Sequence, residues 1–194
     1  MKLVTVRNNY CLFQLPHSPM EILESCYSYT YIEHGRYKMG LILESSVSKK
    51  PSKEVRKDPS YLSYEIKVLQ ELVVGLYLLL EQREKYSELT GKFTEEYLSK
   101  LSQNIYGEAN RLSLNCLLLS KEELLAPFKF LQKVSKAVYL EDWLQFFEQC
   151  EQNSLAFGFE PYWEGVDKAT ACTFYLPKLQ DLGYLITYSE RPMK

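Results

Sequence analysis

Histidine is scarce in this sequence, and its cysteines never come in close pairs. The two histidines, His17 and His34, have no second His or Cys at the spacing of zinc ligands. His17 lies in a proline-flanked segment and is interpreted as a surface loop residue. We therefore predict no zinc site built from His and Cys, and no bound cofactor.

The cysteines are odd in number, irregularly spaced and without a CxxC pair. A disulfide framework or a thiolate metal site shows closer or more regular spacing. We therefore expect reduced, mostly buried thiols, which are typical of a cytoplasmic protein. The positions are Cys11, Cys26, Cys116, Cys150 and Cys172.

The familiar catalytic motifs are also missing. There is no GxxxxGK[ST] phosphate loop, no GxGxxG after a strand and no GxSxG nucleophile elbow. Adjacent carboxylates such as Glu95 with Glu96 fall in first helical turns, where the helix dipole accounts for them. The sequence favours a protein without enzymatic activity. A Cys–His pair or a carboxylate site assembled by the fold stays open as the alternative.

No stretch is apolar enough for a membrane span, and neither sign of charge dominates. The uncharged run from Leu72 to Leu80 is closed by Glu71 and Glu81, while a span needs roughly 20 apolar residues. Residues 1–7 lack the apolar core of a signal peptide. The net charge of −2 gives no bias toward nucleic acid. We predict neither a membrane nor a nucleic acid as partner.

The most organised stretch is residues 58–89, which we interpret as one long helix. Asp58 can cap its first amides, and Pro59 suits the first helical position. Apolar residues then recur every three or four positions, and the run around Leu76 is uncharged on all sides, which indicates burial on all sides. Gly75 within it suggests a closely packed neighbour.

The chain before this helix has the pattern of strands. Residues 2–6 and 10–15 suggest two short strands, and residues 27–45 suggest a hairpin that turns at His34-Gly35. This hairpin would place Glu33 opposite Arg36. Residues 47–57 form a polar, basic linker without aromatic residues. Its cations are Lys49, Lys50, Lys53, Arg56 and Lys57.

The chain after it is mainly helical. Residues 98–119 keep helical spacing, Ser120 with Glu123 forms a capping box, and Pro127 should kink or split the helix that follows. Another helix runs from Leu140 to about residue 153. The tail is predicted as an aromatic loop, a short helix over 174–182 stopped by a glycine, and a strand over 184–188.

These elements predict a helix-rich α+β fold. A small N-terminal antiparallel sheet would pack on a bundle of four to five helices, and the final strand could join that sheet. We expect one domain over residues 1–194. Its parts are a β-rich part (1–46), the linker (47–57), a helical core (58–153) and the tail (154–194).

One regional charge pattern stands out. Residues 137–167 contain no Lys or Arg and seven acidic residues. Acidic groups around aromatic rings suit a basic protein partner. The alternative is a solvated acidic helix face followed by a loop whose aromatic rings cover the core. The predicted binding residues are Glu160, Tyr162, Trp163, Glu164 and Asp167, with Tyr27, Tyr29 and Tyr31 as a second candidate face.

Two hypotheses about function follow. The first is a non-enzymatic cytoplasmic binding protein, for example an immunity or antitoxin-type inhibitor of a basic toxin. The second is a small hydrolase or transferase with an unfamiliar Cys or carboxylate site. A flat acidic face favours the first, and a deep pocket holding a titratable group with a shifted pKa favours the second. The sequence does not specify the oligomeric state.

Overall fold

The computed structural model describes residues 18–27, 32–50, 53–106, 117–156 and 158–189. Within these ranges the chain forms nine α-helices and a short 3-10 turn over Ser87–Leu89, with no strand. The helices are α1 (Pro19–Tyr27), α2 (Ile32–Val47), α3 (Lys53–Lys57), α4 (Pro59–Glu81), α5 (Glu95–Tyr106), α6 (Lys121–Leu125), α7 (Pro127–Ala137), α8 (Leu140–Leu155) and α9 (Val166–Ser189). The predicted α+β class is therefore wrong for the described residues, which are helical throughout.

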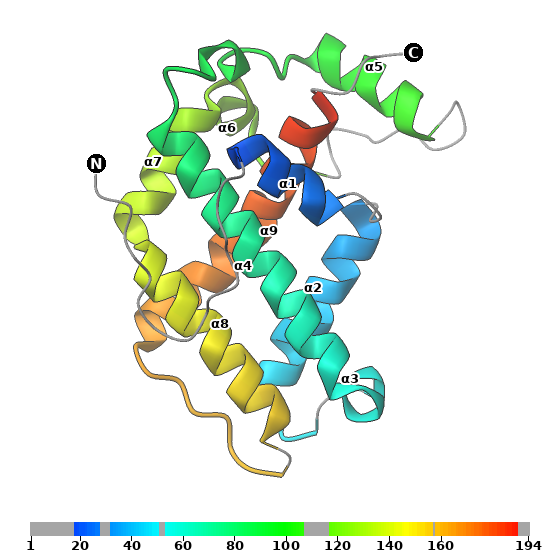
Figure 1. The fold of residues 1–194 in the computed structure, drawn as a ribbon, viewed down its shortest axis with the longest axis vertical. Helices are drawn as coiled ribbons and strands as arrows, with labels where there is room; N and C mark the ends of the chain where they lie inside the picture. Colours follow the sequence, from blue (N-terminus) through cyan, green and yellow to red (C-terminus); the bar gives the residue numbers. More distant parts are fainter. Residues whose placement is uncertain (1–17, 28–31, 51–52, 107–116, 157, 190–194) are drawn as a thin grey trace.

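Helix α4 runs through the middle of the molecule, with α1, α2, α7, α8 and α9 packed around it (Figure 1). Its predicted start is confirmed, because the Asp58 carboxylate accepts hydrogen bonds from the Ser60 and Tyr61 amides at 3.1 and 3.2 Å. It ends at Glu81, eight residues earlier than predicted. The uncharged run is buried on one side only: Leu76 and Leu79 are fully inaccessible, whereas Val74, Tyr77, Leu78 and Leu80 are partly exposed, so the expected burial on all sides is confirmed only in part.

The predicted hairpin over residues 27–45 is wrong, because most of this stretch belongs to α2. The buried face of α2 carries Gly35, Met39, Ile42 and Ser46, at steps of three and four residues. Two of these four, Gly35 and Ser46, are not large apolar residues. The spacing of the apolar residues alone therefore did not reveal the helical period. Gly35 lies inside the helix and forms no turn. The two predicted strands over 2–6 and 10–15 lie outside the described residues.

The predicted final strand is wrong as well. Helix α9 continues from Val166 through Gly183 to Ser189, and residues 184–187 are buried within it. A segment rich in aromatic and β-branched residues can form a stable helix when its side chains are buried on every side of that helix. The predicted stop at Gly183 fails because this glycine is needed for packing.

Two glycines let α1 approach its neighbours closely. A Cβ on Gly75 of α4 would lie 3.1 Å from side-chain atoms of Ile22 and Leu23. A Cβ on Gly183 of α9 would lie 2.5 Å from Leu72 Cδ1 and 3.0 Å from the Tyr27 hydroxyl. The close neighbour inferred at Gly75 is therefore confirmed as α1.

The middle of the chain follows its local signals. The Ser120 hydroxyl accepts a hydrogen bond from the Glu123 amide at 3.2 Å, and the Ser120 amide donates to the Glu123 carboxylate at 2.8 Å. Pro127 separates α6 from α7 and occupies the first turn of α7. The linker is less open than predicted, because its residues 53–57 form α3 and Val55 is buried against the core.

A buried ion pair joins three parts of the chain. Asp181 of α9 is wholly buried and accepts hydrogen bonds from Arg36 Nε and Nη2 of α2, at 3.0 and 2.6 Å. Its second oxygen accepts the Leu118 amide at 2.7 Å. Burial raises the pKa of Asp181, while the Leu118 amide and the Arg36 guanidinium oppose that shift. The carboxylate therefore fixes α2, α9 and the segment before α6 in one arrangement.

We predict that Gly183→Ala destabilises the protein by about 1–3 kcal/mol, because the added methyl group enters a filled space. Gly40→Ala of α2 is the matched control, since no described group from elsewhere in the fold lies within 4 Å of the position that its Cβ would take. That control should gain up to about 1 kcal/mol from helix propensity. Denaturant unfolding measures both, and equal effects of the two changes would contradict the packing role of Gly183.

Removing one partner of the buried ion pair should be costly. Asp181→Ala should lower the free energy of unfolding by about 3–5 kcal/mol, because Arg36 and the Leu118 amide lose their acceptor. Lys100→Ala is the control, because it removes an exposed ion pair with Glu96 and should have little effect. Unfolding curves at low and high salt test this, and a loss at Asp181 as small as the control would refute the structural role.

Candidate protein-binding surface

Residues 158–165, which lead into α9, are held by hydrogen bonds at two places. The Asn153 side chain donates to the Tyr162 carbonyl at 2.9 Å and accepts the Tyr162 amide at 3.0 Å. The Gly158 amide donates to the Lys49 carbonyl at 3.2 Å, with Gly158 at φ 83°. We call residues 158–167, which comprise this loop and the first two residues of α9, the acidic–aromatic loop; these hydrogen bonds give its backbone a defined shape.

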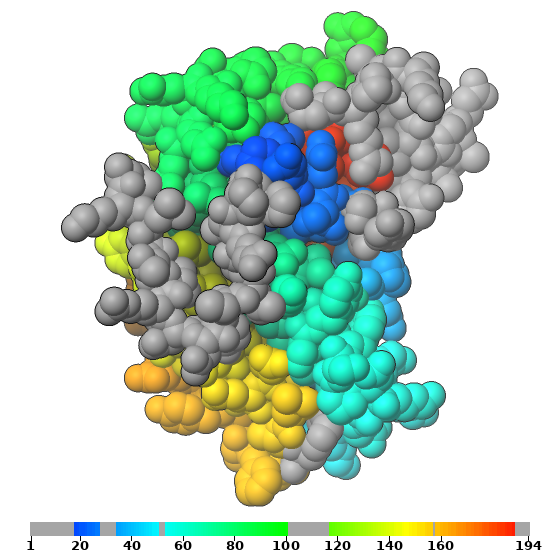
Figure 2. All heavy atoms as spheres, in the orientation of Figure 1, coloured from blue at the N-terminus to red at the C-terminus, as the bar shows by residue number. Residues whose placement is uncertain are grey.

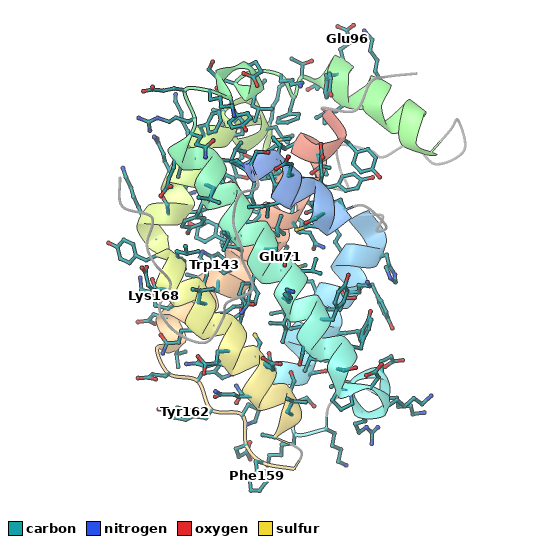
Figure 3. The ribbon with its side chains drawn as sticks, viewed as in Figure 1. Glu71, Glu96, Trp143, Phe159, Tyr162 and Lys168 are labelled. Carbon is teal, nitrogen blue, oxygen red and sulfur yellow. The ribbon has the colours of Figure 1, made fainter. Side chains whose placement is uncertain are left out.

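Two aromatic side chains of this loop point into solvent. Phe159 and Tyr162 are each 73% exposed, more than any other large hydrophobic residue that the structure describes. Figure 3 shows Phe159 at the lower tip of the molecule and Tyr162 on the same stretch of loop. Sequence reasoning named Tyr162 but missed Phe159. The signal that could have indicated its exposure is its position between a glycine and a glutamate in a loop.

Trp163 points the other way and covers the core. Its ring stacks on Phe146 of α8 at 5.6 Å between centroids, with 28° between the planes. Phe146 in turn contacts Trp143 and Phe147, which are both buried. Trp163 therefore covers the core, as the alternative interpretation of this loop expected for its aromatic rings, whereas Tyr162 is exposed.

The predicted carboxylates lie on the loop surface. Glu160, Glu164 and Asp167 are all exposed. Glu164 accepts a hydrogen bond from Gln145 of α8 at 3.2 Å. The structure therefore brings four of the five primary predicted residues to the surface of one segment, with Trp163 half-buried behind them.

The fold adds two cations that the sequence pattern did not reveal. Lys49 forms an exposed ion pair with Glu160. Lys168 lies 3.2 Å from Asp142, donates to the Ala137 carbonyl at 3.1 Å, and sits over the Tyr139 ring. Lys49 is far from residues 137–167 in the chain, so the fold places it against this stretch, whereas Lys168 directly follows the stretch in the sequence. The surface is therefore less acidic than the sequence suggests.

The second candidate face is not supported by its described member. Tyr27 is 3% exposed, and its hydroxyl donates to the Gln180 carbonyl at 2.7 Å. Its ring lies edge-on to Tyr184 at 5.5 Å. Tyr27 is a core residue and is closed to a partner. Tyr29 and Tyr31 lie outside the described residues.

The described thiols are poor candidates for catalysis. Cys26, Cys150 and Cys172 are buried and unpaired, and burial raises the pKa of each to about 12. A thiol must ionise to act as a nucleophile, so these three are unreactive near neutral pH. Cys11, Cys116 and His17 lie outside the described residues, and His34 is exposed on α2.

Two hollows among the described residues are lined mainly by apolar side chains, together with a few charged ones. A hollow of about 280 Å³ between α5 and α6 is lined by apolar side chains such as Phe93 and Leu124, with the Glu95–Lys121 ion pair beside it. Among the described residues, no three His, Cys, Asp or Glu side chains group closely enough to hold a metal ion. In the same ranges, no helix has the length and apolarity to cross a membrane.

No family model, curated protein or solved structure matches this chain. Its function is therefore inferred from its own residues and their arrangement.

The two neighbouring aromatic residues should respond differently to truncation. Trp163→Ala should cost about 1–3 kcal/mol, because it removes a half-buried ring stacked on Phe146. Tyr162→Ala should change stability by less than about 0.5 kcal/mol, as is usual for an exposed side chain. Urea unfolding of both variants tests the assignment, and a larger loss for Tyr162 would reverse it.

Proposed function

We propose that this protein is a non-enzymatic binding protein that holds a basic protein partner on its acidic–aromatic loop. The observation that carries this proposal is the pair of exposed rings, Phe159 and Tyr162, on a hydrogen-bonded loop among Glu160, Glu164 and Asp167. An immunity or antitoxin-type inhibitor of a basic toxin is one concrete form of such a protein.

The fixed backbone of the loop supports this function. A loop that is ordered before binding loses little conformational entropy when a partner docks. The two hydrogen bonds to Asn153 set the loop at Tyr162, and the Lys49 carbonyl holds it at Gly158. Large aromatic side chains presented in this way contribute much of the binding energy in protein interfaces.

The charges around the rings support a basic partner. Glu160 already forms an ion pair with Lys49 within the molecule. The Glu160 side chain is 75% exposed and the Lys49 side chain is 57% exposed. An exposed pair of this kind is weak, so a lysine or arginine of a partner can replace Lys49 at little cost. Glu164 and Asp167 extend the negative surface along the loop toward α9.

The proposal places the protein in the cytoplasm. The three described cysteines are buried and unpaired, as is typical of proteins that function in a reducing compartment. Their raised pKa values give no support to the alternative of a cysteine enzyme.

The test is binding kinetics with a partner captured on the tagged protein and identified by mass spectrometry. Glu160→Lys with Glu164→Lys should slow association about tenfold or more and flatten its salt dependence, because long-range attraction is removed. Phe159→Ala with Tyr162→Ala should instead leave association nearly unchanged and speed dissociation, because buried rings act after contact.

Two matched controls separate the loop from general effects. Glu81→Lys with Glu84→Lys makes the same change in net charge at two exposed positions, the last residue of α4 and the turn after it. Phe174→Ala removes an exposed ring from α9. Neither should alter the kinetics. Equal effects of the loop variants and the controls would rule out the loop as the binding surface.

A further inference from the structure

A basic segment lies directly beside the acidic–aromatic loop. The Lys49 carbonyl accepts the Gly158 amide, and the Lys49 side chain pairs with Glu160. Helix α3 follows at once in the chain. Figure 2 shows the atoms of α3 (cyan) and of the loop after α8 (yellow to orange) at the same end of the molecule.

Helix α3 presents its cations outward. Val55 is 1% exposed and seats the helix on the body of the molecule, since α3 packs against α4. Lys53, Arg56 and Lys57 of the same helix are exposed, as is Lys50 before it. We call residues 49, 50 and 53–57 the basic segment. Within the basic segment, Lys49 contacts the loop directly, and α3 lies at the same end of the molecule.

Exposed apolar side chains accompany these charges. Val47 at the end of α2 is 64% exposed, Leu155 at the end of α8 is 38% exposed, and Phe159 is 73% exposed. All three lie within a few residues of the hydrogen bond between Lys49 and Gly158. One end of the molecule therefore carries a positive strip, a negative strip and apolar groups.

We propose that this end of the molecule docks onto the same end of a second copy of the chain. In a two-fold pair each contact is made twice, so the basic segment of each copy would face the acidic–aromatic loop of the other. The apolar side chains Val47, Leu155 and Phe159 would then be covered near the two-fold axis. This inference rests on the proposed function, because it names one basic partner for the same loop.

The arrangement of charges favours a second copy over a nucleic acid. Phosphate groups drawn to Lys53, Arg56 and Lys57 would approach Glu160 and Glu164, which repel them. A partner must carry both signs in the opposite order to match this end of the molecule. A second copy related by a two-fold axis meets that condition.

The experiment uses two charge-reversed variants of the full chain. The first carries Lys53→Glu, Arg56→Glu and Lys57→Glu, and the second carries Glu160→Lys and Glu164→Lys. Each variant alone would set like charges against like charges at both contacts. In an equal mixture, the new acids of the first variant face the new lysines of the second. The unchanged acidic–aromatic loop of the first variant faces the unchanged basic segment of the second.

Sedimentation velocity measures the association. The wild-type protein should form a reversible dimer that weakens tenfold or more between about 50 mM and 500 mM salt, because the Debye length shortens from roughly 14 Å to 4 Å. Each variant alone should associate at least tenfold more weakly than the wild type. The equal mixture should recover dimers that contain one copy of each variant, which differential tagging reveals.

Three results would overturn the inference: a wild-type protein that stays monomeric at about 100 μM in low salt, variants that dimerise as the wild type does, or a mixture that fails to pair. Circular dichroism checks that both variants fold. If either does not, Lys53→Gln with Lys57→Gln and Glu160→Gln with Glu164→Gln replace them, and each pair must weaken the dimer. A monomeric protein whose loop still binds a captured basic partner refutes the dimer alone. A protein that dimerises equally well when Glu160 and Glu164 are reversed to Lys refutes the dimer interface inferred here.

Discussion

The close approach of α1 to both α4 and α9 is the constraint on which the rest of this structure depends. Gly75 and Gly183 leave room for Ile22, Leu23 and Tyr27 where a side chain would collide with them. The Tyr27 hydroxyl then reaches the Gln180 carbonyl. With α1 in this position, Leu72 and Leu76 of α4 and residues 184–187 of α9 are buried, which stabilises these apolar stretches as helices.

Charged groups fix the order in which the outer helices pack. Arg36 and the Leu118 amide converge on the buried Asp181, and Lys38 of α2 lies 2.5 Å from Glu65 of α4. Removing either cation would leave a buried carboxylate without its partner, which is costly. They specify how α2 sits on α9 and α4, while apolar burial supplies most of the stability. The acidic–aromatic loop inherits its position from α2 and α8, which run side by side toward it (Figure 1).

The signals that could be read from the sequence were local ones. Asp58 and Ser120 accept hydrogen bonds from amides two or three residues ahead, and Pro127 begins a helix because it lacks an N–H, so the roles of all three follow from local sequence alone. The hairpin and the final strand were wrong because the small residues of α2 and Gly183 of α9 serve contacts with distant helices. The same division holds at the loop. Its acids and Tyr162 were predicted, but the inward turn of Trp163 onto Phe146 and the placement of Lys49 beside Glu160 depend on tertiary structure.

The hydrogen bond from Tyr27 to Gln180 also has a consequence for biosynthesis. It joins residues 153 positions apart, so α1 and α4 leave the ribosome well before α9 exists to cover them. At roughly 5–20 residues per second, the interval between the synthesis of Tyr27 and that of Gln180 is about 8–30 s. During it, the surfaces around Leu72 and Tyr27 that α9 later covers are open to water and to chaperones. Long-range contacts of this kind also slow folding, because chain entropy is lost before the contact forms. The nascent chain is therefore most prone to aggregation just before its last described helix is made.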